Sequence, residues 1–157
     1  MSPDANPILR LQGFLPYRLS ILSNRVSGTI ARMYARDFGL TIWQWRVLAV
    51  VAEHGALRAS DIAERTAMDK VAVSRAVARL IEKGHVKRLA SARDGRSSQV
   101  TLTRKGRKVY DRIVPRARAY EEQLLEGFSE GQRAVLDDLM STLLARARQL
   151  DDKLDGK

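Results

Sequence analysis

The chain contains no cysteine, two histidines and no apolar run of the roughly 20 residues that a membrane helix needs. The absence of cysteine excludes disulfide bonds, thiolate metal sites and thiol-based redox switches. His54 and His85 stand alone in the sequence, without neighbours at the spacing of metal ligands, so we expect no metal and no cofactor. The N-terminus lacks a signal-peptide pattern. We therefore expect a cytoplasmic protein that does not contact membranes.

The sequence also lacks the residue sets that catalysis requires. It has no clustered carboxylates, no Ser-His-Asp set, no glycine-rich phosphate loop and no metal-ligand spacing, so an enzyme is not expected. Its charge favours a binding protein instead, because 28 Lys and Arg outnumber 18 Asp and Glu for a net charge of +10. Such an excess favours a polyanionic partner, of which nucleic acid is the commonest, although a merely basic soluble protein would show it too.

The spacing of the apolar residues predicts a mainly helical chain. Apolar side chains recur at steps of three and four from Leu15 to Met33, which indicates a long helix that ends near Phe38 before Gly39. Capping signals and apolar steps predict five further helices, at about 41–54, 60–66, 69–84, 103–128 and 129–150. Two short segments, 86–89 and 99–102, are expected to form a β-hairpin.

The stretch 60–103 is the most informative part of the chain. A short helix, a turn, a longer helix with exposed cations and a basic hairpin follow one another there. This is the order of a winged helix-turn-helix, which places a helix in the major groove of DNA and a hairpin near the minor groove. In the longer helix Val73, Val77 and Leu80 face inward. The opposite face is expected to bind DNA through Lys70, Val71, Ser74, Arg75 and Arg79.

The residue types on the helix and on the hairpin suit this task. Arginine can form two hydrogen bonds with guanine, serine can donate or accept, and Val71 can contact a thymine methyl group. The hairpin contributes Arg88 on its first strand and Arg93, Asp94 and Arg96 at its turn. We expect Asp94 to orient a neighbouring arginine, and the arginines to reach the minor groove or phosphates. A solvated basic face with an ordinary surface ion pair is the alternative.

Together these segments resemble the MarR family of bacterial winged helix-turn-helix regulators over almost the whole chain. The resemblance rests on LTIWQWRVLAVVAEHG before the motif, MDKVAVSRAVARLIEKG as recognition helix, VKR entering the wing, DGR at its tip and VTLTRKG leaving it. It implies one domain over 1–157, with a DNA-binding lobe at about 40–103 and a helical dimerisation region at 1–39 and 104–157. It also implies a homodimer that binds a pseudo-palindromic operator in double-stranded DNA, with half-sites about one helical turn apart.

Apolar stripes on the terminal helices favour the same assembly. The first, fifth and last helices carry more apolar surface than the middle of the chain can cover, so we expect them to pair with a second copy. Packing of these stripes within one chain is the alternative.

MarR-like proteins are typically repressors that small, often aromatic and anionic, ligands release from DNA. The resemblance implies a ligand site between the first, second and fifth helices. There Arg46 could pair with a carboxylate while Trp43 stacks on its ring. Our candidate site, for an aromatic carboxylate or thioester, comprises Arg32, Tyr34, Trp43, Arg46, Val47 and Val50. The alternative is that both tryptophans pack in the core and that Arg46 pairs with Asp37 or Glu53.

The sequence therefore predicts a ligand-responsive homodimeric repressor. A DNA-binding protein without small-molecule control, including an architectural one, is an alternative. So is an activator, because the sign of regulation depends on where the operator lies relative to the promoter.

Overall fold

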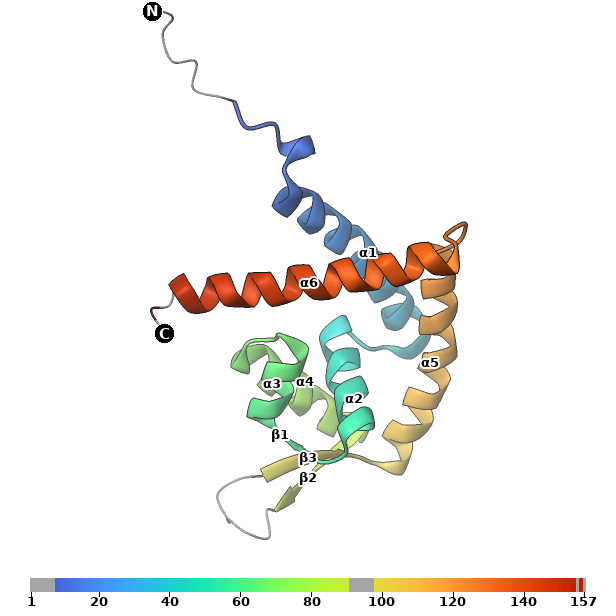
Figure 1. The fold of residues 1–157 in the computed structure, drawn as a ribbon. Helices are drawn as coiled ribbons and strands as arrows, with labels where there is room; N and C mark the ends of the chain where they lie inside the picture. The colour runs from blue at the N-terminus through green and yellow to red at the C-terminus, as the bar shows by residue number, and fades with distance from the viewer. Residues whose placement is uncertain (1–7, 91–97, 155, 157) are drawn as a thin grey trace, which may run out of the picture. The chain divides into compact units, whose positions relative to one another are not determined.

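The computed structural model describes residues 8–90, 98–154 and 156. Within these residues the elements are the 3-10 helix η1 (Leu11–Gly13), helices α1 (Leu15–Phe38), α2 (Ile42–His54), α3 (Ala59–Thr66), α4 (Lys70–Glu82), α5 (Arg104–Leu124) and α6 (Glu130–Leu154), and strands β1 (Leu57–Arg58), β2 (Val86–Ala90) and β3 (Ser98–Leu102) (Figure 1). The chain divides into two compact units, Met1–Ala117 and Arg118–Lys157. In the described ranges no helix is both long and apolar enough to span a membrane.

The helix ends of the first unit follow from their capping residues. Gly39 ends α1 in the left-handed conformation, with a φ of 64°, which costs glycine little. Thr41 Oγ1 accepts from the N–H of Gln44 at 3.2 Å, and Gln44 Oε1 accepts from the N–H of Thr41 at 3.2 Å. The Asp69 carboxylate accepts from the N–H of Ala72 at 2.7 Å and begins α4. The predicted starts of α2 and α4 and the predicted end of α1 are confirmed.

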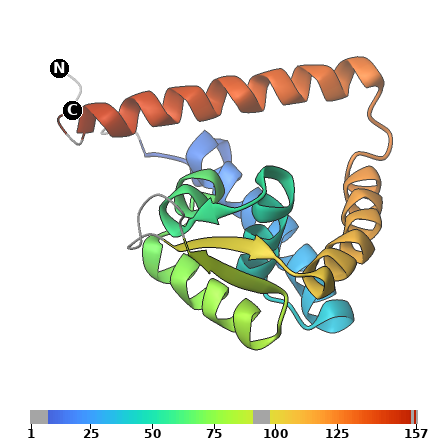
Figure 2. The ribbon, with the colours of Figure 1, turned by 90° about the horizontal axis from the view of Figure 1, so that it is seen from below.

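The three strands form one antiparallel sheet in the order β1-β3-β2. The predicted hairpin is confirmed and is one residue longer on each strand, with pairing from Val86 opposite Leu102 to Ala90 opposite Ser98. Strand β1 is an addition to the sequence-based expectation, because two residues are too few to show an alternating pattern. Helix α4 packs beside β2 and lies along the hairpin in Figure 2.

One hydrophobic core joins the elements of the first unit. Its fully buried side chains come from α1 to α5, from the sheet and from the connection between α1 and α2: Tyr34, Leu40, Val47, Leu48, Val51, Ile62, Val73, Val77, Leu80, Val86, Val100 and Ile113. The predicted inner face of α4, with Val73, Val77 and Leu80, is thus confirmed. Because this face is held by the core, the opposite face of α4 is directed to solvent.

The second unit contains the end of α5 and the whole of α6. The expectation that the fifth helix reaches Phe128 needs correction, since α5 ends at Leu124 and Gly127 takes a φ of 85° in the turn that follows. Ser129 and Gln132 form the predicted capping box, with hydrogen bonds of 2.9 and 3.2 Å. None of the α6 residues, all of which are described, is buried. Its exposed apolar side chains include Val135, Leu136, Leu139, Met140, Leu143, Leu144 and Leu150.

Candidate nucleic-acid interface

The outer face of α4 combines cations with small side chains. Lys70, Val71, Ser74 and Arg75 are all exposed, as predicted for a face that meets DNA. Val71 is 59% exposed although it lies on a helix whose other face is packed in the core. The buried face fixes the position of the helix, so these four side chains are presented together on a rigid element.

Arg79, further along α4, already has an intramolecular partner. Its Nη1 lies 2.8 Å from Glu82 Oε2, and both side chains are well exposed. Exposed pairs of this kind stabilise a protein by about 0–1 kcal/mol. The pairing therefore leaves Arg79 able to exchange the carboxylate for a phosphate at small cost.

The hairpin next to α4 carries further exposed cations. Lys87 and Arg88 on β2 are exposed, and Arg88 Nη1 donates to Ser98 Oγ on β3 at 2.9 Å. This cross-strand hydrogen bond holds the guanidinium over the sheet. The wing-tip candidates Arg93, Asp94 and Arg96 lie outside the described residues, and so does their expected ion pairing.

Thr103 connects the hairpin to α5 and to the turn that follows α4. Its Oγ1 accepts from the N–H of Gly106 at 3.0 Å, as predicted for the cap of this helix. The same hydroxyl donates to the Gly84 carbonyl at 2.6 Å, and the Thr103 N–H donates to the His85 carbonyl at 3.0 Å. The turn that follows α4 and the start of α5 are therefore joined through Thr103.

His85 lies within this junction and is buried, with 6% of its surface exposed. Its Nδ1 has no hydrogen-bond partner among the described residues. Burial, followed by the positive charges of Lys105 and Lys83, lowers the pKa of His85 below its usual value. The folded protein therefore favours the neutral imidazole. The sequence shows only an isolated histidine here, and nothing local reveals its burial.

The six ligand candidates do not come together in one place. Tyr34, Val47 and Val50 are buried in the core, and burial raises the pKa of Tyr34 to about 12. Trp43 is 47% exposed, and the Arg46 guanidinium carbon lies 5.2 Å from the centre of its ring. Trp43 is exposed and Arg46 half-buried, so the indole remains accessible to a second planar group.

Arg32, the sixth candidate, lies on α1. Its Nη2 donates to Thr29 Oγ1 at 3.2 Å. These two residues, with Met33 and Arg36, line a cavity of about 520 Å³. Arg32 therefore borders a concave, positively charged surface.

The alternative that both tryptophans of the second helix pack in the core is correct for only one of them. Trp45 is the packing residue, with its ring centre 5.2 Å from that of Tyr34 and 5.6 Å from that of Tyr110. The suggested ion pairs of Arg46 with Asp37 or Glu53 are wrong. Asp37 pairs with other arginines, and the described partner of Glu53 is His54, at 3.7 Å.

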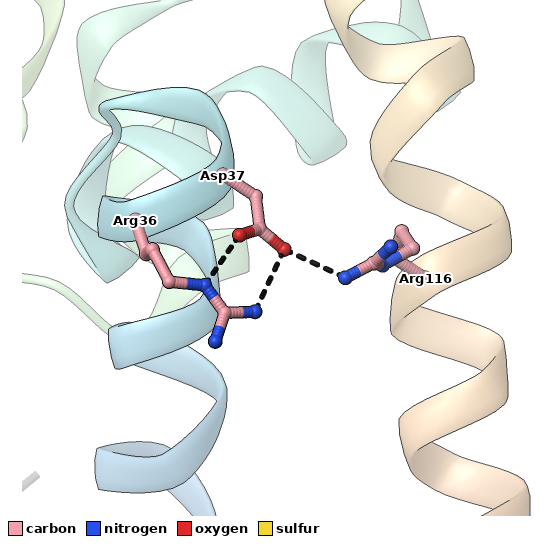
Figure 3. A network of polar contacts seen from close by, with 3 residues as sticks. All are labelled: Arg36, Asp37 and Arg116. Atoms are coloured by element: carbon pink, nitrogen blue, oxygen red, sulfur yellow. Dashed lines mark hydrogen bonds and ion pairs between the residues drawn. The ribbon is translucent and has the colours of Figure 1, made fainter.

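Asp37 joins the end of α1 to the middle of α5 (Figure 3). Its carboxylate lies 2.6 Å from Arg36 Nε and 2.7 Å from Arg116 Nη2. The hydrogen bond from Arg36, together with the charges of both arginines, holds the pKa of Asp37 below its usual value. Asp37, Phe38, Arg112 and Arg116 line a cavity of about 340 Å³. Sequence reasoning missed this cluster, because 79 residues separate Asp37 from Arg116.

Comparison with known proteins shows which family and which solved structures this chain is similar to. Residues 38–97 match the family model described as MarR family. The chain is 27% identical over 157 aligned positions to the transcriptional activatory protein BadR of Rhodopseudomonas palustris, covering 98% of this chain and 89% of that protein. It is 23% identical over 125 positions to the homoprotocatechuate degradative operon repressor of Escherichia coli, covering 80% and 84%. The crystal structure of a MarR/EmrR family transcriptional regulator from Acinetobacter sp. ADP1 superposes with a TM-score of 0.84 at 26% identity, covering 90% and 99%.

Proposed function

Because the chain belongs to the MarR family of transcriptional regulators, we propose that it binds operator DNA in a sequence-specific manner as a homodimer. The outer face of α4 would read base edges in the major groove through Arg75, Ser74 and Val71, while Lys70 and Arg79 contact phosphates. Arg88 and the wing-tip residues Arg93, Asp94 and Arg96 would contact the minor groove or the backbone. In this proposal 1–157 form one domain whose DNA-binding lobe is about 40–103.

The observation that carries this proposal is the division of α4 into two faces. Val73, Val77 and Leu80 bury one face. The other face exposes two cations, a serine hydroxyl and the side chain of Val71. An isolated basic helix face would be ordinary, but this one lies directly beside a hairpin with further cations. The net charge of +10 supports a polyanionic partner.

Exposed apolar side chains support the homodimer. Along α6 seven apolar residues share a stripe and none is buried, and in α1 Leu15 and Leu22 are 46% and 54% exposed. Apolar patches of this extent usually mark an interaction site. A second copy would cover them with its own equivalent helices, and two-fold symmetry would give the two recognition helices the spacing of a pseudo-palindrome.

We propose further that a small aromatic carboxylate, or a thioester of one, controls DNA binding. The exposed Trp43 with the half-buried Arg46 beside it, and the arginine-lined cavities along α1 and α5, supply an aromatic surface and positive charge. The name of the Escherichia coli relative refers to the degradation of homoprotocatechuate, so this compound belongs in the first panel. We favour repression. Activation is the alternative, because one of the two relatives is named as an activator and the other as a repressor.

Hydroxyl-radical footprinting on DNA from upstream of the protein's own gene tests the DNA-binding part. We expect two protected half-sites about one helical turn apart. Protection that spreads evenly along the duplex would indicate an architectural or non-specific DNA-binding protein instead.

Thermal shift with a panel of aromatic acids and their thioesters tests the ligand part, because a ligand that binds only the folded state raises the melting temperature. We expect at least one compound both to raise the melting temperature and to weaken operator binding. Arg46→Met should abolish both effects, and Arg133→Met, a change in the second unit, should leave them intact. A panel without effect on operator affinity would favour the ligand-independent alternative.

A further inference from the structure

Lys83 reaches two helices outside the one that it ends. It is the C-cap residue of α4, and its ammonium group donates to the Gly39 carbonyl at the end of α1. The same group lies 3.3 Å from Gln44 Oε1 in the first turn of α2. That amide oxygen also accepts from the N–H of Thr41 in the α2 capping box. The Lys83 side chain therefore links the recognition helix to the point where α1 passes into α2.

The backbone of Lys83 makes a third connection. Its carbonyl accepts from Lys105 Nζ of α5 at 2.7 Å, while its N–H donates to the Arg79 carbonyl of α4 at 3.1 Å. One residue thus bonds to α1, α2, α4 and α5. The helices that flank the DNA-binding lobe in the sequence converge on the C-terminal end of the recognition helix.

Helix dipoles favour a cation at this position. Gly39 and Lys83 lie at the C-terminal ends of α1 and α4, where the unpaired carbonyl groups carry partial negative charge. Lys83 is half-buried, and its ammonium group satisfies one of these carbonyls. A methionine would fill similar space but could donate no hydrogen bond.

We propose that Lys83 is a positioning residue for DNA recognition. It fixes the position of α4 relative to α1, α2 and α5 and does not itself contact DNA. This inference rests on the proposed function, because it requires that the outer face of α4 reads bases. A cation that contacts phosphate and a cation that positions a helix differ in one measurable respect. Removing a phosphate contact lowers the slope of log affinity against log salt by about 1, whereas removing a positioning contact leaves the slope unchanged.

Fluorescence anisotropy across a salt series, on the operator and on a shuffled duplex, tests the proposal. Lys83→Met should weaken operator binding about tenfold, the effect of losing one hydrogen bond to a charged group. Its salt slope and its binding to the shuffled duplex should match those of the unmodified protein. Lys87→Met is the matched control: Lys87 is an exposed cation next to Arg88 on the hairpin that we propose to contact DNA, so its loss should lower the slope by about 1. Lys83→Arg should restore most of the affinity.

Three results would overturn the proposal. The first is an unchanged operator affinity in Lys83→Met, and the second is a salt slope lowered as in Lys87→Met. The third is an equal loss of affinity for both duplexes together with a loss of protein stability. If Lys83→Met fails to melt cooperatively, Lys105→Met removes the α5 contact alone and should give a smaller, operator-specific loss with no change in slope. Failure of the proposed function is distinguishable, because the unmodified protein would then bind both duplexes alike.

Discussion

Gly106 approaches the backbone of His85 so closely that a Cβ atom on Gly106 would lie 1.9 Å from the His85 carbonyl oxygen and 2.8 Å from its carbon. These are backbone atoms, so no side-chain rotation can relieve the overlap. The contact brings the first turn of α5 onto the turn that follows α4.

Gly106→Ala should therefore destabilise the protein by about 1–3 kcal/mol, the usual effect of forcing an extra group into a packed site. Urea denaturation followed by circular dichroism measures this change. Gly28→Ala is the control, because its Cβ would meet only the end of the flexible Arg32 side chain at 3.9 Å. Alanine within a helix should stabilise by up to about 1 kcal/mol there. Equal stability of the two variants would contradict the described junction.

His85 should make the stability of the fold fall at mildly acidic pH. Its pKa is lowered in the folded state by burial and by two nearby ammonium groups, so the unfolded chain binds the proton first. The neutral His85 contributes fully to the free energy of unfolding above the pKa of histidine in the unfolded chain, about 6.5. This contribution is lost as the pH falls below that value, by at most about 1.4 kcal/mol per pH unit.

Urea denaturation at a series of pH values between 7.5 and 5 checks this expectation. His85→Leu, which cannot titrate, should flatten the profile by at most the equivalent of one proton. His54→Gln is the control, because His54 is exposed beside Glu53. A profile that His85→Leu leaves as steep as before would show that the imidazole is not held neutral.

Leu139→Asp should separate the proposed dimer. Leu139 is 54% exposed on the apolar stripe of α6, where an unpaired carboxylate would be buried on association at high cost. Sedimentation velocity should show a monomer, and operator affinity should fall with it. Leu154→Asp, at the 85% exposed end of the same helix, is the matched control and should remain a dimer. A monomeric Leu139→Asp that keeps full operator affinity would contradict a DNA-binding dimer.

Arg75→Ala should change sequence preference rather than merely weaken binding. If Arg75 contacts a base, discrimination should relax by about 1–3 kcal/mol at one operator position, and at its symmetric equivalent. Arg96→Ala, at the proposed wing tip, should weaken binding evenly across sequences and lower the salt slope. A set of single-base operator variants measured with both proteins separates these effects. Unchanged affinity in both folded variants would refute the assigned DNA-binding surface.

The features that the sequence predicted are those that depend on near neighbours. Gly39, the Thr41–Gln44 box and Asp69 mark helix ends because each acts within one turn. The two faces of α4 follow from its own period of 3.6 residues. The hairpin is predicted from two short strand-like segments, 86–89 and 99–102, on either side of a sequence with a glycine.

The features that sequence reasoning missed join residues far apart in the chain. From the sequence alone, Asp37 could pair with any of several cations. That it pairs with Arg116 depends on how α1 packs against α5. The Lys83 contact to Gly39 spans 44 residues, and the close approach of Gly106 exists only because β3 returns to the end of α4. Such pairings are set by tertiary packing, which leaves no periodic signal in the sequence.

Operator selectivity is the most direct test of the central claim that this chain is a sequence-specific DNA-binding regulator. Fluorescence anisotropy should be measured on the duplex from upstream of its own gene and on a shuffled duplex of equal composition, at two salt concentrations. We predict that the native duplex binds at least about 1,000-fold more tightly, saturates at one dimer per palindrome and keeps this preference at the higher salt. Equal, steeply salt-dependent binding to both duplexes, repeated across the remaining upstream DNA, would contradict it.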